Sequence, residues 1–566
     1  MKKTNDNEQK IVIYQMLVRL FGNTNPTRHP NGTLAVNGCG KMNDINPAAL
    51  RSIRQLGCNY VWYTGLIQQA TQTDWSYLGL PRQDRHVVKG IAGSPYAITD
   101  YYSVSPDLAE DPLNRMAEFD ALVERTHKAG LKLIIDFVPN HVARQYHSTM
   151  KPEGTRDLGQ DDNTGVAFSP DNNFYYIPDQ PFAPWFDLGS GDDQYTECPA
   201  KVTGNDCFTP SPDKNDWYET VKLNYGINYL CGGEKHFSPI PSTWKKMLDI
   251  LLYWAGKGVD GFRCDMAHMV PVEFWAWALP QVKKAAQQGV IFIAEIYEPS
   301  VYRAYIEAGF DYLYDKVGLY DTLKSVIRWE RSASDITYCW QAHGDIQDHM
   351  LNFLENHDEQ RIASDFFAGA PEKGFPGLAT GLLMNRSPYM IYFGQELGER
   401  GMDEEGYSGR DGRTTIFDYW SLPKVIQWHG EGDSWSLAGL GKEEKKVRDY
   451  YRSLLTLAAE HPVFTAGKFW DLEYAQFNNP GFDTQRLYAF LRYGGKERAL
   501  VVANFSESNG KVWVDIPREA WDELKIRTKT LTFTNLLKGK SYRIPFDPTE
   551  PVPVDIDADS VTVLTF

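Results

Sequence analysis

Short apolar runs recur along most of the chain and alternate with segments whose apolar residues have helical spacing. Eight of these runs have the length expected of strands, at residues 11–16, 59–63, 131–138, 258–264, 290–294, 310–314, 350–355 and 389–393. Helices are predicted between them, for example at residues 113–129, 243–256 and 271–288. Uninterrupted apolar runs indicate strands that are covered on both faces. Eight such strands alternating with helices predict an α/β fold, a closed parallel (β/α)8 or TIM barrel.

Two parts of the chain break this alternation. Residues 142–241 are rich in Asp, Asn, Gly, Pro and aromatic residues and show little periodicity, which predicts an irregular inserted subdomain after strand three. Beyond His461-Pro462 the pattern becomes one of alternating residues, at 487–493, 499–505 and 561–566. This pattern predicts a small antiparallel β-sandwich. The predicted domains are therefore a barrel from residues 1–141 and 242–460, an inserted domain at 142–241 and a C-terminal sandwich at 461–566.

Composition narrows the environment and the partners. The 566 residues carry a net charge of −16, which disfavours nucleic acid and anionic membranes as partners. Residues 1–10 contain no apolar run typical of a secretory signal, and no segment has the length of a membrane span, so a cytoplasmic location is expected. Seven cysteines fit mostly reduced thiols, although Cys198 and Cys207 would be able to pair in an oxidising compartment. The oligomeric state stays open.

The candidate chemistry lies where predicted strands end. Carboxylates stand at or just beyond the ends of three of them, Asp265, Glu295 and Asp358. Cleavage of a glycosidic bond needs one carboxylate to attack or stabilise the anomeric carbon and a second carboxyl group to protonate the leaving oxygen. Arg263 lies two residues before Asp265 on the same strand and is expected to lower its pKa. Any one of these groups alone would be read as a structural ion pair or a rim charge, but together they predict an active site.

Four segments at these strand ends, in this order, resemble the signature segments of the α-amylase superfamily of glycoside hydrolases. They are Asp136-Phe137-Val138-Pro139-Asn140-His141, Gly261-Phe262-Arg263-Cys264-Asp265, Ala294-Glu295-Ile296-Tyr297 and Phe353-Leu354-Glu355-Asn356-His357-Asp358. Supporting resemblances are found at Pro95–Tyr101, Lys222–Tyr225 and Tyr392–Glu396. The resemblance covers about residues 11 to 460, and the trailing sandwich fits the C-terminal domain of that family.

The resemblance implies a role for each matching residue. Asp265 would be the nucleophile, Glu295 the general acid/base and Asp358 the stabiliser of the transition state. Residues that orient the nucleophile or hold the sugar would be Arg263, His141, His357 and Tyr96, the last by stacking on the sugar ring. The implied mechanism is a retaining double displacement through a covalent glycosyl-enzyme. It requires Glu295 to carry a proton while Asp265 stays ionised.

Some positions depart from the family pattern. His268 stands where a lysine that binds sugars beyond the cleaved bond is expected, and it is retained as a candidate for substrate binding. Asn140 matches a usual ligand of a structural calcium ion, or it is held by local hydrogen bonds. Arg361 either lies near the leaving group or forms a salt bridge. Met266 fits neither the small residue common in α-1,4 enzymes nor the valine common in α-1,6 enzymes.

These observations predict an enzyme that cleaves α-1,4-glucosidic bonds in maltooligosaccharides, starch or glycogen fragments. An α-glucan is the expected partner, and no organic cofactor is expected. Two alternatives share the same three carboxylates, an α-glucan transglycosylase and an α-glucosidase. A remote third alternative is an inactive carbohydrate-binding barrel, since fold alone does not determine function.

Overall fold

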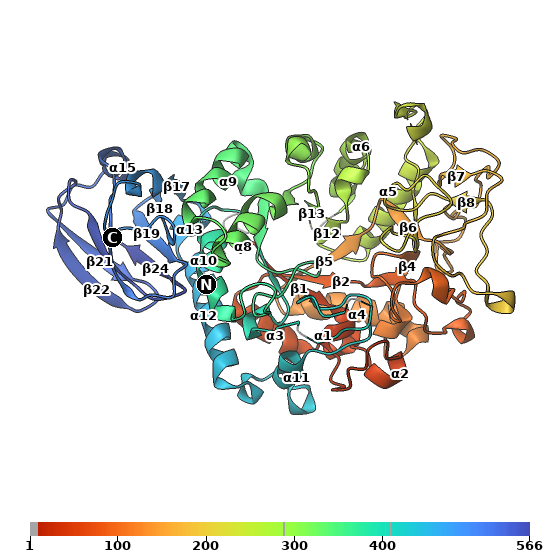
Figure 1. Cartoon of the computed structure of the whole chain (residues 1–566), viewed down its shortest axis with the longest axis horizontal. Helices are drawn as coiled ribbons and strands as arrows, with labels where there is room; N and C mark the ends of the chain where they lie inside the picture. The colour runs from red at the N-terminus through yellow and green to blue at the C-terminus, as the bar shows by residue number, and fades with distance from the viewer. Residues whose placement is uncertain (1–8, 287–288, 402, 408) are drawn as a thin grey trace.

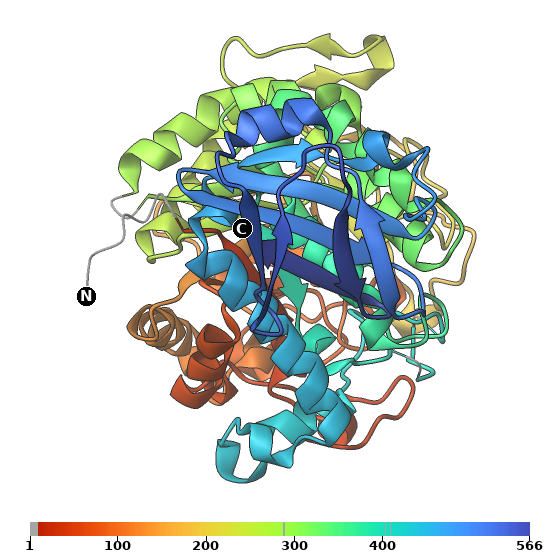
Figure 2. The same ribbon diagram turned by 90° about the vertical axis from the view of Figure 1, so that its left-hand side faces the viewer.

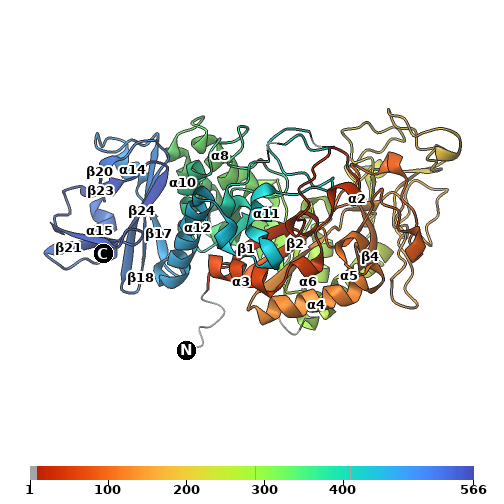
Figure 3. The same cartoon turned by 90° about the horizontal axis from the view of Figure 1, so that it is seen from below.

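The computed structural model describes residues 9–286, 289–401, 403–407 and 409–566. Residues 1–8, on which the expectation about a secretory signal partly depends, and the predicted end of a helix near Gln288 lie outside these ranges. Along the long axis of the molecule, the C-terminal sheet and the inserted segment lie at opposite ends with the barrel between them (Figures 1 and 3). Among the described helices, none is both long and apolar enough to cross a membrane.

The central element is a closed barrel of eight parallel strands, which confirms the predicted TIM barrel. Its strands are β1 (Val12–Leu17), β2 (Tyr60–Thr64), β5 (Lys132–Phe137), β12 (Gly261–Cys264), β13 (Ile291–Ala294), β14 (Tyr312–Tyr314), β15 (Met350–Phe353) and β16 (Tyr389–Tyr392). They lie at the eight predicted positions, and β16 closes the barrel against β1. Side chains such as Ile13, Ile134 and Met390 fill the barrel interior.

Local sequence sets where the barrel elements begin and how closely they approach. Helix α3 (Pro47–Leu56) begins after Asn46, whose side-chain oxygen accepts hydrogen bonds from the N–H groups of Ala48 and Ala49 at 2.8 and 3.0 Å. At the start of β12, a Cβ on Gly261 would lie 2.8 Å from the Ile291 side chain on one flanking strand and 3.0 Å from that of Ile134 on the other. Glycine is required there because both neighbouring strands approach the backbone.

Helices cover the outside of the barrel. The main ones are α4 (Arg115–Lys128), α5 (Ser242–Gly256), α6 (Val272–Ala285), α8 (Asp321–Ile327), α9 (Ile336–His343), α10 (Phe375–Leu383) and α12 (Lys442–Glu460). Helix α12 packs against α3 and α10, so the last long helix of the barrel region contacts the long helix between β1 and β2 and closes the outer layer.

The inserted segment is held by short strands and buried polar contacts. Its strands are β6 (His141–Ala143), β7 (Tyr176–Ile177), β8 (Ala200–Lys201), β9 (Thr220–Lys222), β10 (Ile227–Asn228) and β11 (Glu234–Lys235), of which β6 pairs with β9. Arg144 is buried in an ion pair with Glu197 at 2.6 Å. The predicted boundary at residue 142 falls inside β6, and the one at 242 coincides with the start of α5. Cys198 and Cys207 are both free thiols, as are the other five cysteines.

The C-terminal region forms an antiparallel sandwich, as predicted. A six-stranded sheet has the order β17 (Lys468–Asp471), β18 (Leu487–Gly494), β19 (Glu497–Asn504), β24 (Ser560–Thr565), β21 (Thr530–Asn535) and β22 (Lys540–Pro545). A second sheet pairs β20 (Gly510–Val514) with β23 (Val552–Ile556). The two sheets share one apolar core with helix α15 (Arg518–Leu524). Figure 2 shows this region from its own end of the molecule, with the barrel behind it.

Candidate active site

A cavity of about 540 Å³ opens at the carboxyl ends of the barrel strands. It is lined by six residues predicted for the site, Asp265, Glu295, Asp358, Tyr96, His141 and His357. Asp265 directly follows β12 and Glu295 directly follows β13, whereas Asp358 lies in the loop after β15. The three carboxyl groups therefore converge because parallel strands in a closed barrel deliver their ends to one rim.

Arg263 lies beneath these carboxyl groups. Its guanidinium contacts Asp265 Oδ1 at 2.8 Å through one terminal nitrogen and Glu295 Oε2 at 2.7 Å through the other. The side chain is 1% exposed and does not line the cavity. The neighbouring carboxylates raise the pKa of Arg263 well above its ordinary value despite its burial. Arg263 thus fixes the two carboxyl groups relative to each other and is placed to orient them rather than to touch a sugar.

The two carboxyl oxygens of Asp265 differ in their contacts. Its Oδ1 is held by Arg263, whereas its Oδ2 is buried and has no hydrogen-bond partner among the described residues. Burial raises the pKa of Asp265 well above its ordinary value, Glu295 raises it further, and the Arg263 guanidinium opposes both. The sequence predicted that Arg263 would hold this pKa low. The structure corrects this expectation, because the loss of water around the carboxyl group outweighs its ion pair.

Glu295 is held by three donors. Its Oε2 accepts from Arg263 and from the main-chain N–H of Met266 at 2.9 Å, and its Oε1 accepts from the Tyr297 hydroxyl at 2.6 Å. Met266 has a φ of 42°, in the left-handed region that non-glycine residues rarely adopt. This conformation occurs in the residue whose N–H contacts Glu295. The strained residue is thus the one whose main-chain N–H holds the Glu295 carboxyl group in place.

His357 connects Asp358 to the aromatic wall of the cavity. Its Nε2 lies 3.0 Å from Asp358 Oδ2 and 2.6 Å from the Tyr96 hydroxyl oxygen, and its Nδ1 accepts from the Gln15 amide at 2.8 Å. Since Nδ1 accepts, Nε2 carries the proton of the neutral ring. Burial lowers the pKa of His357 well below its ordinary value, with Arg263 contributing. Burial and the neighbouring Glu295 raise the pKa of Asp358 to about 7.

His141 forms the wall of the cavity toward the inserted segment. Its ring centroid lies 5.2 Å from that of Trp217. Burial, together with Lys222 and Lys89, lowers the pKa of His141 to about 3, so the ring is neutral at physiological pH. A neutral imidazole in this position can exchange hydrogen bonds with sugar hydroxyls.

The surroundings of Asn140 do not fit a calcium ion. Its side-chain oxygen accepts from the Lys222 ammonium at 2.9 Å, and its amide donates to the Gly204 carbonyl at 2.7 Å. Lys222 is 2% exposed and also pairs with Asp206 at 2.5 Å. A lysine ammonium therefore takes the oxygen ligands that a hard cation would need. Among the described residues there is also no group of three or more His, Cys, Asp or Glu side chains arranged to hold a metal.

Besides Arg263, two further predicted substrate-binding residues lie outside the cavity lining. His268 is half-buried, and its ring centroid is 6.4 Å from that of Tyr297. Arg361 is fully buried and forms an ion pair with Glu355 at 2.9 Å. It also donates to the Phe393 carbonyl at 2.9 Å. Of the two readings offered by the sequence, this geometry corresponds to the internal salt bridge.

The cavity also contains residues that the sequence did not single out. They are Lys89, Ser94, Trp217, Glu219, Thr220, Tyr297, Lys316, Val317, Glu359, Arg413, Ile416 and Phe417, and Met266, which the sequence analysis named, also lines the cavity. Several form pairs across the wall, such as Lys89 with Glu219 at 3.1 Å and Lys316 with Glu359 at 3.3 Å. Tyr297 could have been found from its position two residues beyond Glu295. Most of the others come from irregular loops, where no periodicity predicts which side chains face inward.

Comparison with known proteins shows the family to which the chain is similar. A family model described as the catalytic domain of α-amylase matches residues 15–471. The chain is 21% identical over 399 residues to α-amylase 3 of Dictyoglomus thermophilum, covering 66% of this chain and 68% of the relative. It is 22% identical over 528 residues to the cyclomaltodextrin glucanotransferase of Geobacillus stearothermophilus, covering 88% of this chain and 60% of the relative. With the α-glucosidase of Culex pipiens the identity is 26% over 172 residues, covering 30% of this chain and only 24% of that protein.

Solved structures show the same fold. A maltogenic α-amylase from Thermotoga neapolitana has a TM-score of 0.62 at 19% identity, with coverage of 100% of this chain and 99% of that chain. An α-amylase from Geobacillus thermoleovorans complexed with acarbose has a TM-score of 0.62 at 16% identity, with coverage of 99% of both chains.

Proposed function

Because the chain belongs to the α-amylase family, whose members are glycosidases and glycosyltransferases of α-glucans, we propose that it cleaves α-1,4-glucosidic bonds in maltooligosaccharides with retention of configuration. The observation that carries this proposal is the convergence of Asp265, Glu295 and Asp358 on one cavity, with Arg263 contacting the first two at 2.8 and 2.7 Å. Two carboxyl groups in distinct roles are what glycoside cleavage requires.

In the proposed first step, Asp265 Oδ2 attacks the anomeric carbon of the sugar. The glycosidic bond breaks, and its oxygen takes a proton from Glu295 while a covalent ester forms between the sugar and Asp265. In the second step a water molecule gives a proton to Glu295 and attacks the same carbon, which releases Asp265. Atoms and charges return to their starting state, and two displacements restore the original configuration.

Within the carboxyl cluster the raised pKa values belong to Asp265 and Asp358, whereas the mechanism requires the proton on Glu295. Burial raises the pKa of Asp265 and of Asp358, the latter to about 7, so the cluster of three carboxyl groups retains a proton near neutral pH. The mechanism assigns this proton to Glu295 when substrate is bound. The Tyr297 hydroxyl, 2.6 Å from Glu295, can donate to the ionised acid and accept from the protonated one.

The size of the cavity supports a short substrate segment. Its 540 Å³ lies within the range of about 300–1,000 Å³ that is usual for small-molecule sites. Tyr96 and Trp217 provide aromatic surface at its wall, and neutral His141 and His357 provide hydrogen-bonding groups. Maltooligosaccharides therefore fit this site as the proposed substrate class.

The proposal is tested by incubating the protein with maltoheptaose, pullulan, panose and sucrose and analysing the products. Hydrolysis raises the number of reducing ends, whereas transfer to a second sugar leaves it nearly constant, so the same assay separates the two chemistries. We expect new reducing ends from maltoheptaose, released in the α-configuration. Release of the β-anomer would contradict retention.

Two variants test the assigned roles. Asp265→Asn and Glu295→Gln are each expected to lower kcat by at least about 10³-fold, because the nucleophile or the proton donor is removed. Asp449→Asn, on the exposed face of α12, is the matched control and should retain activity. Activity close to wild type in either Asp265→Asn or Glu295→Gln would overturn the mechanism.

A further inference from the structure

A second cavity, of about 830 Å³, lies at the end of the barrel opposite to the carboxyl groups. Its lining comes from the starts of barrel strands, for example Ile11 before β1, Tyr60 in β2, Ile291 in β13 and Tyr312 in β14. These four side chains pack against the lowest layer of the barrel interior and form an apolar floor. The cavity has the volume of a small-molecule site and does not share lining residues with the catalytic cavity.

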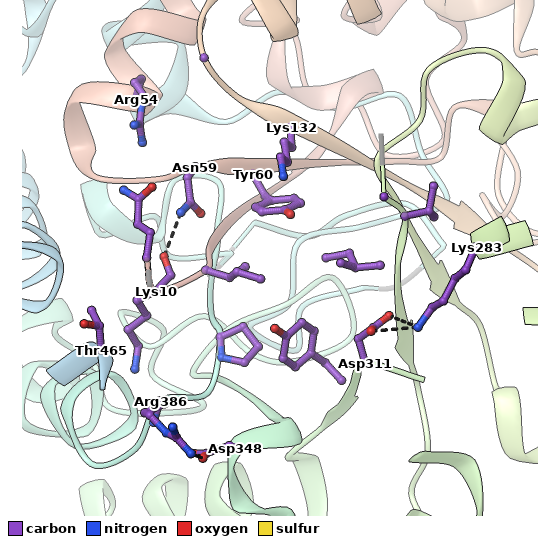
Figure 4. A pocket seen from close by; sticks show the side chains of 18 residues that line it. Lys10, Arg54, Asn59, Tyr60, Lys132, Lys283, Asp311, Asp348, Arg386 and Thr465 are labelled. Carbon is purple, nitrogen blue, oxygen red and sulfur yellow. Dashed lines mark hydrogen bonds and ion pairs between the residues drawn. The ribbon is translucent and has the colours of Figure 1, made fainter. Parts of the chain in front are cut away.

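The walls of this second cavity are strongly basic. Among the residues that the structure describes, five basic side chains line it against two acidic ones, in a chain whose net charge is −16. The basic side chains are Lys10, Arg54, Lys132, Lys283 and Arg386, and they surround the Tyr60 ring (Figure 4). A local reversal of charge in an acidic protein attracts anions to this place.

The two acidic residues are already neutralised. Asp311 pairs with Lys283 at 2.9 Å, and Asp348 accepts from Arg386 Nε at 2.8 Å. Figure 4 shows both pairs at the edge of the cavity. They leave Lys10, Arg54 and Lys132 as the source of the excess charge.

These three cations form no ion pair within the described part of the chain. Lys10 donates to the Asn385 carbonyl at 2.8 Å, Arg54 donates to the Cys58 carbonyl at 3.0 Å, and the Lys132 ammonium lies 5.6 Å from the centre of the Tyr60 ring. Neutral carbonyls and a ring face satisfy some donors but do not balance a charge. Several donors therefore remain for an anion.

The lowered pKa of Lys10 shows that its positive charge is unfavourable in this cavity. Lys10 is 5% exposed, and burial, aided by the positive charge of Arg492, lowers its pKa well below its ordinary value. Asp348 opposes this shift without forming an ion pair with Lys10, and a buried ammonium without a paired counter-ion is unfavourable. An anion in the cavity would supply the missing charge, so binding and the full protonation of Lys10 would reinforce each other.

We propose that this cavity binds a phosphorylated small molecule, with phosphate oxygens contacting Lys10, Arg54 and Lys132 and the less polar part lying over Tyr60 and Tyr312. A phosphate ester brings about two negative charges and three acceptor oxygens, which matches three cations better than one carboxylate does. The guanidinium of Arg54 suits bidentate contact with phosphate. The aromatic and aliphatic floor provides a surface for a sugar or base ring.

Binding is measured on the full-length protein by calorimetric titration and by thermal melts. The probes are inorganic phosphate, glucose 6-phosphate and ATP. Glucose, adenosine and sodium chloride at matched ionic strength are the controls. We expect at least one organic phosphate to raise the melting temperature and to bind at least about tenfold more tightly than inorganic phosphate. Preference for glucose 6-phosphate or for ATP then identifies the ring that the floor accepts.

Variants locate the site. Arg54→Gln and Lys132→Gln are each expected to weaken binding of the preferred probe at least about tenfold, whereas Lys284→Gln should bind as wild type. Lys284 is an exposed neighbour of Lys283 on α6 and does not line the cavity. Hydrolysis of maltoheptaose and the melting temperature without probe verify that each variant is folded. The proposal is overturned if no phosphorylated probe binds beyond the salt control, if inorganic phosphate binds as tightly as the esters, or if the two lining variants bind as well as Lys284→Gln.

Discussion

The Tyr297 hydroxyl is placed to control the orientation of the proposed acid/base. It lies 2.6 Å from Glu295 Oε1, on the side of the carboxyl group that is not held by Arg263. Since a hydroxyl can donate to the ionised acid and accept from the protonated one, the contact can persist through both steps of the reaction. Tyr297 therefore acts on the sugar mainly through Glu295 and is a positioning residue.

Tyr297→Phe should lower kcat about tenfold while changing KM less. The loss of one hydrogen bond to the acid corresponds to about 1–1.5 kcal/mol, and tenfold in rate corresponds to about 1.4 kcal/mol. Steady-state kinetics with maltoheptaose measure both constants. Tyr338→Phe, which removes the hydroxyl of a side chain exposed on α9, is the matched control. An unchanged kcat in folded Tyr297→Phe would exclude this positioning role.

The ionisation of Asp358 makes the folding stability depend on pH, and the sign of this dependence follows from the shift of its pKa. Its folded pKa of about 7 lies above the ordinary value of 3.8, which applies to the unfolded chain. The folded state therefore binds this proton more tightly than the unfolded state does. Stability from this group is fully present below about pH 4 and is lost as the pH rises through 7.

The Asp358 side chain is 42% exposed, so solvent screens part of the effect, and Asp358→Asn should raise the melting temperature at pH 8 by only roughly 1–3 °C, and much less at pH 5, where Asp358 keeps its proton. The amide is close in shape to the protonated acid but cannot ionise. Thermal melts of both proteins at the two pH values measure the effect, with Asp449→Asn as a surface control. The same stabilisation at pH 5 and pH 8 would mean that ionisation of Asp358 is not its cause.

At the scale of single residues, the sequence predicted the position of a side chain correctly where the residue follows a buried strand. Asp265 and Glu295 follow β12 and β13 directly, so the barrel itself brings them together. For Arg361 the sequence left two possibilities open, and the structure shows the ion pair with Glu355. The ionisation of Asp265 ran against expectation, because burial depends on the whole surrounding structure whereas its arginine neighbour is visible in the sequence.

At the scale of elements, regular strands and helices were predictable and the inserted segment was not. Each barrel strand is a continuous apolar run between turn residues, and all eight were located. The inserted segment instead contains strands of two or three residues joined by polar contacts between distant positions. Asn140 and Lys222 lie in the turn before β6 and in β9, and nothing in the sequence pairs an amide with that lysine.

This pairing leads to a prediction about metal removal. Because the Lys222 ammonium occupies the side-chain oxygen of Asn140 at 2.9 Å, treatment with EDTA should leave both the melting temperature and the activity unchanged. Thermal melts and maltoheptaose hydrolysis before and after dialysis against the chelator measure the two quantities. Protein returned to buffer with calcium is the control. A fall in melting temperature that calcium restores would show a structural ion after all.

At the scale of the whole molecule, buried polar groups form hydrogen bonds between the C-terminal sandwich and the barrel. Asp471 at the end of β17 accepts from Thr337 and Trp340 of α9, at 2.7 and 2.6 Å. Arg492 of β18 donates to the Met384 carbonyl next to α10 at 2.8 Å and to the Gly467 carbonyl at 2.9 Å. The sequence predicted the alternating strands of this sandwich but not its attachment, because Thr337, Trp340 and Met384 lie on or next to barrel helices more than a hundred residues away.

A substitution of Arg492 tests how much this attachment contributes to stability. Arg492 is 1% exposed, and burial lowers its pKa to about 10. Replacing it with leucine leaves main-chain carbonyls of Met384, Gly467 and Val463 without this donor, at about 1–3 kcal/mol for each group that stays unpaired. Relief from burying the charge offsets part of this cost. We therefore expect Arg492→Leu to lower the free energy of unfolding by about 2–4 kcal/mol in urea titrations. Arg543→Leu, on the exposed face of β22, is the matched control, and equal stability of the two variants would show that the buried guanidinium does not fasten the domains.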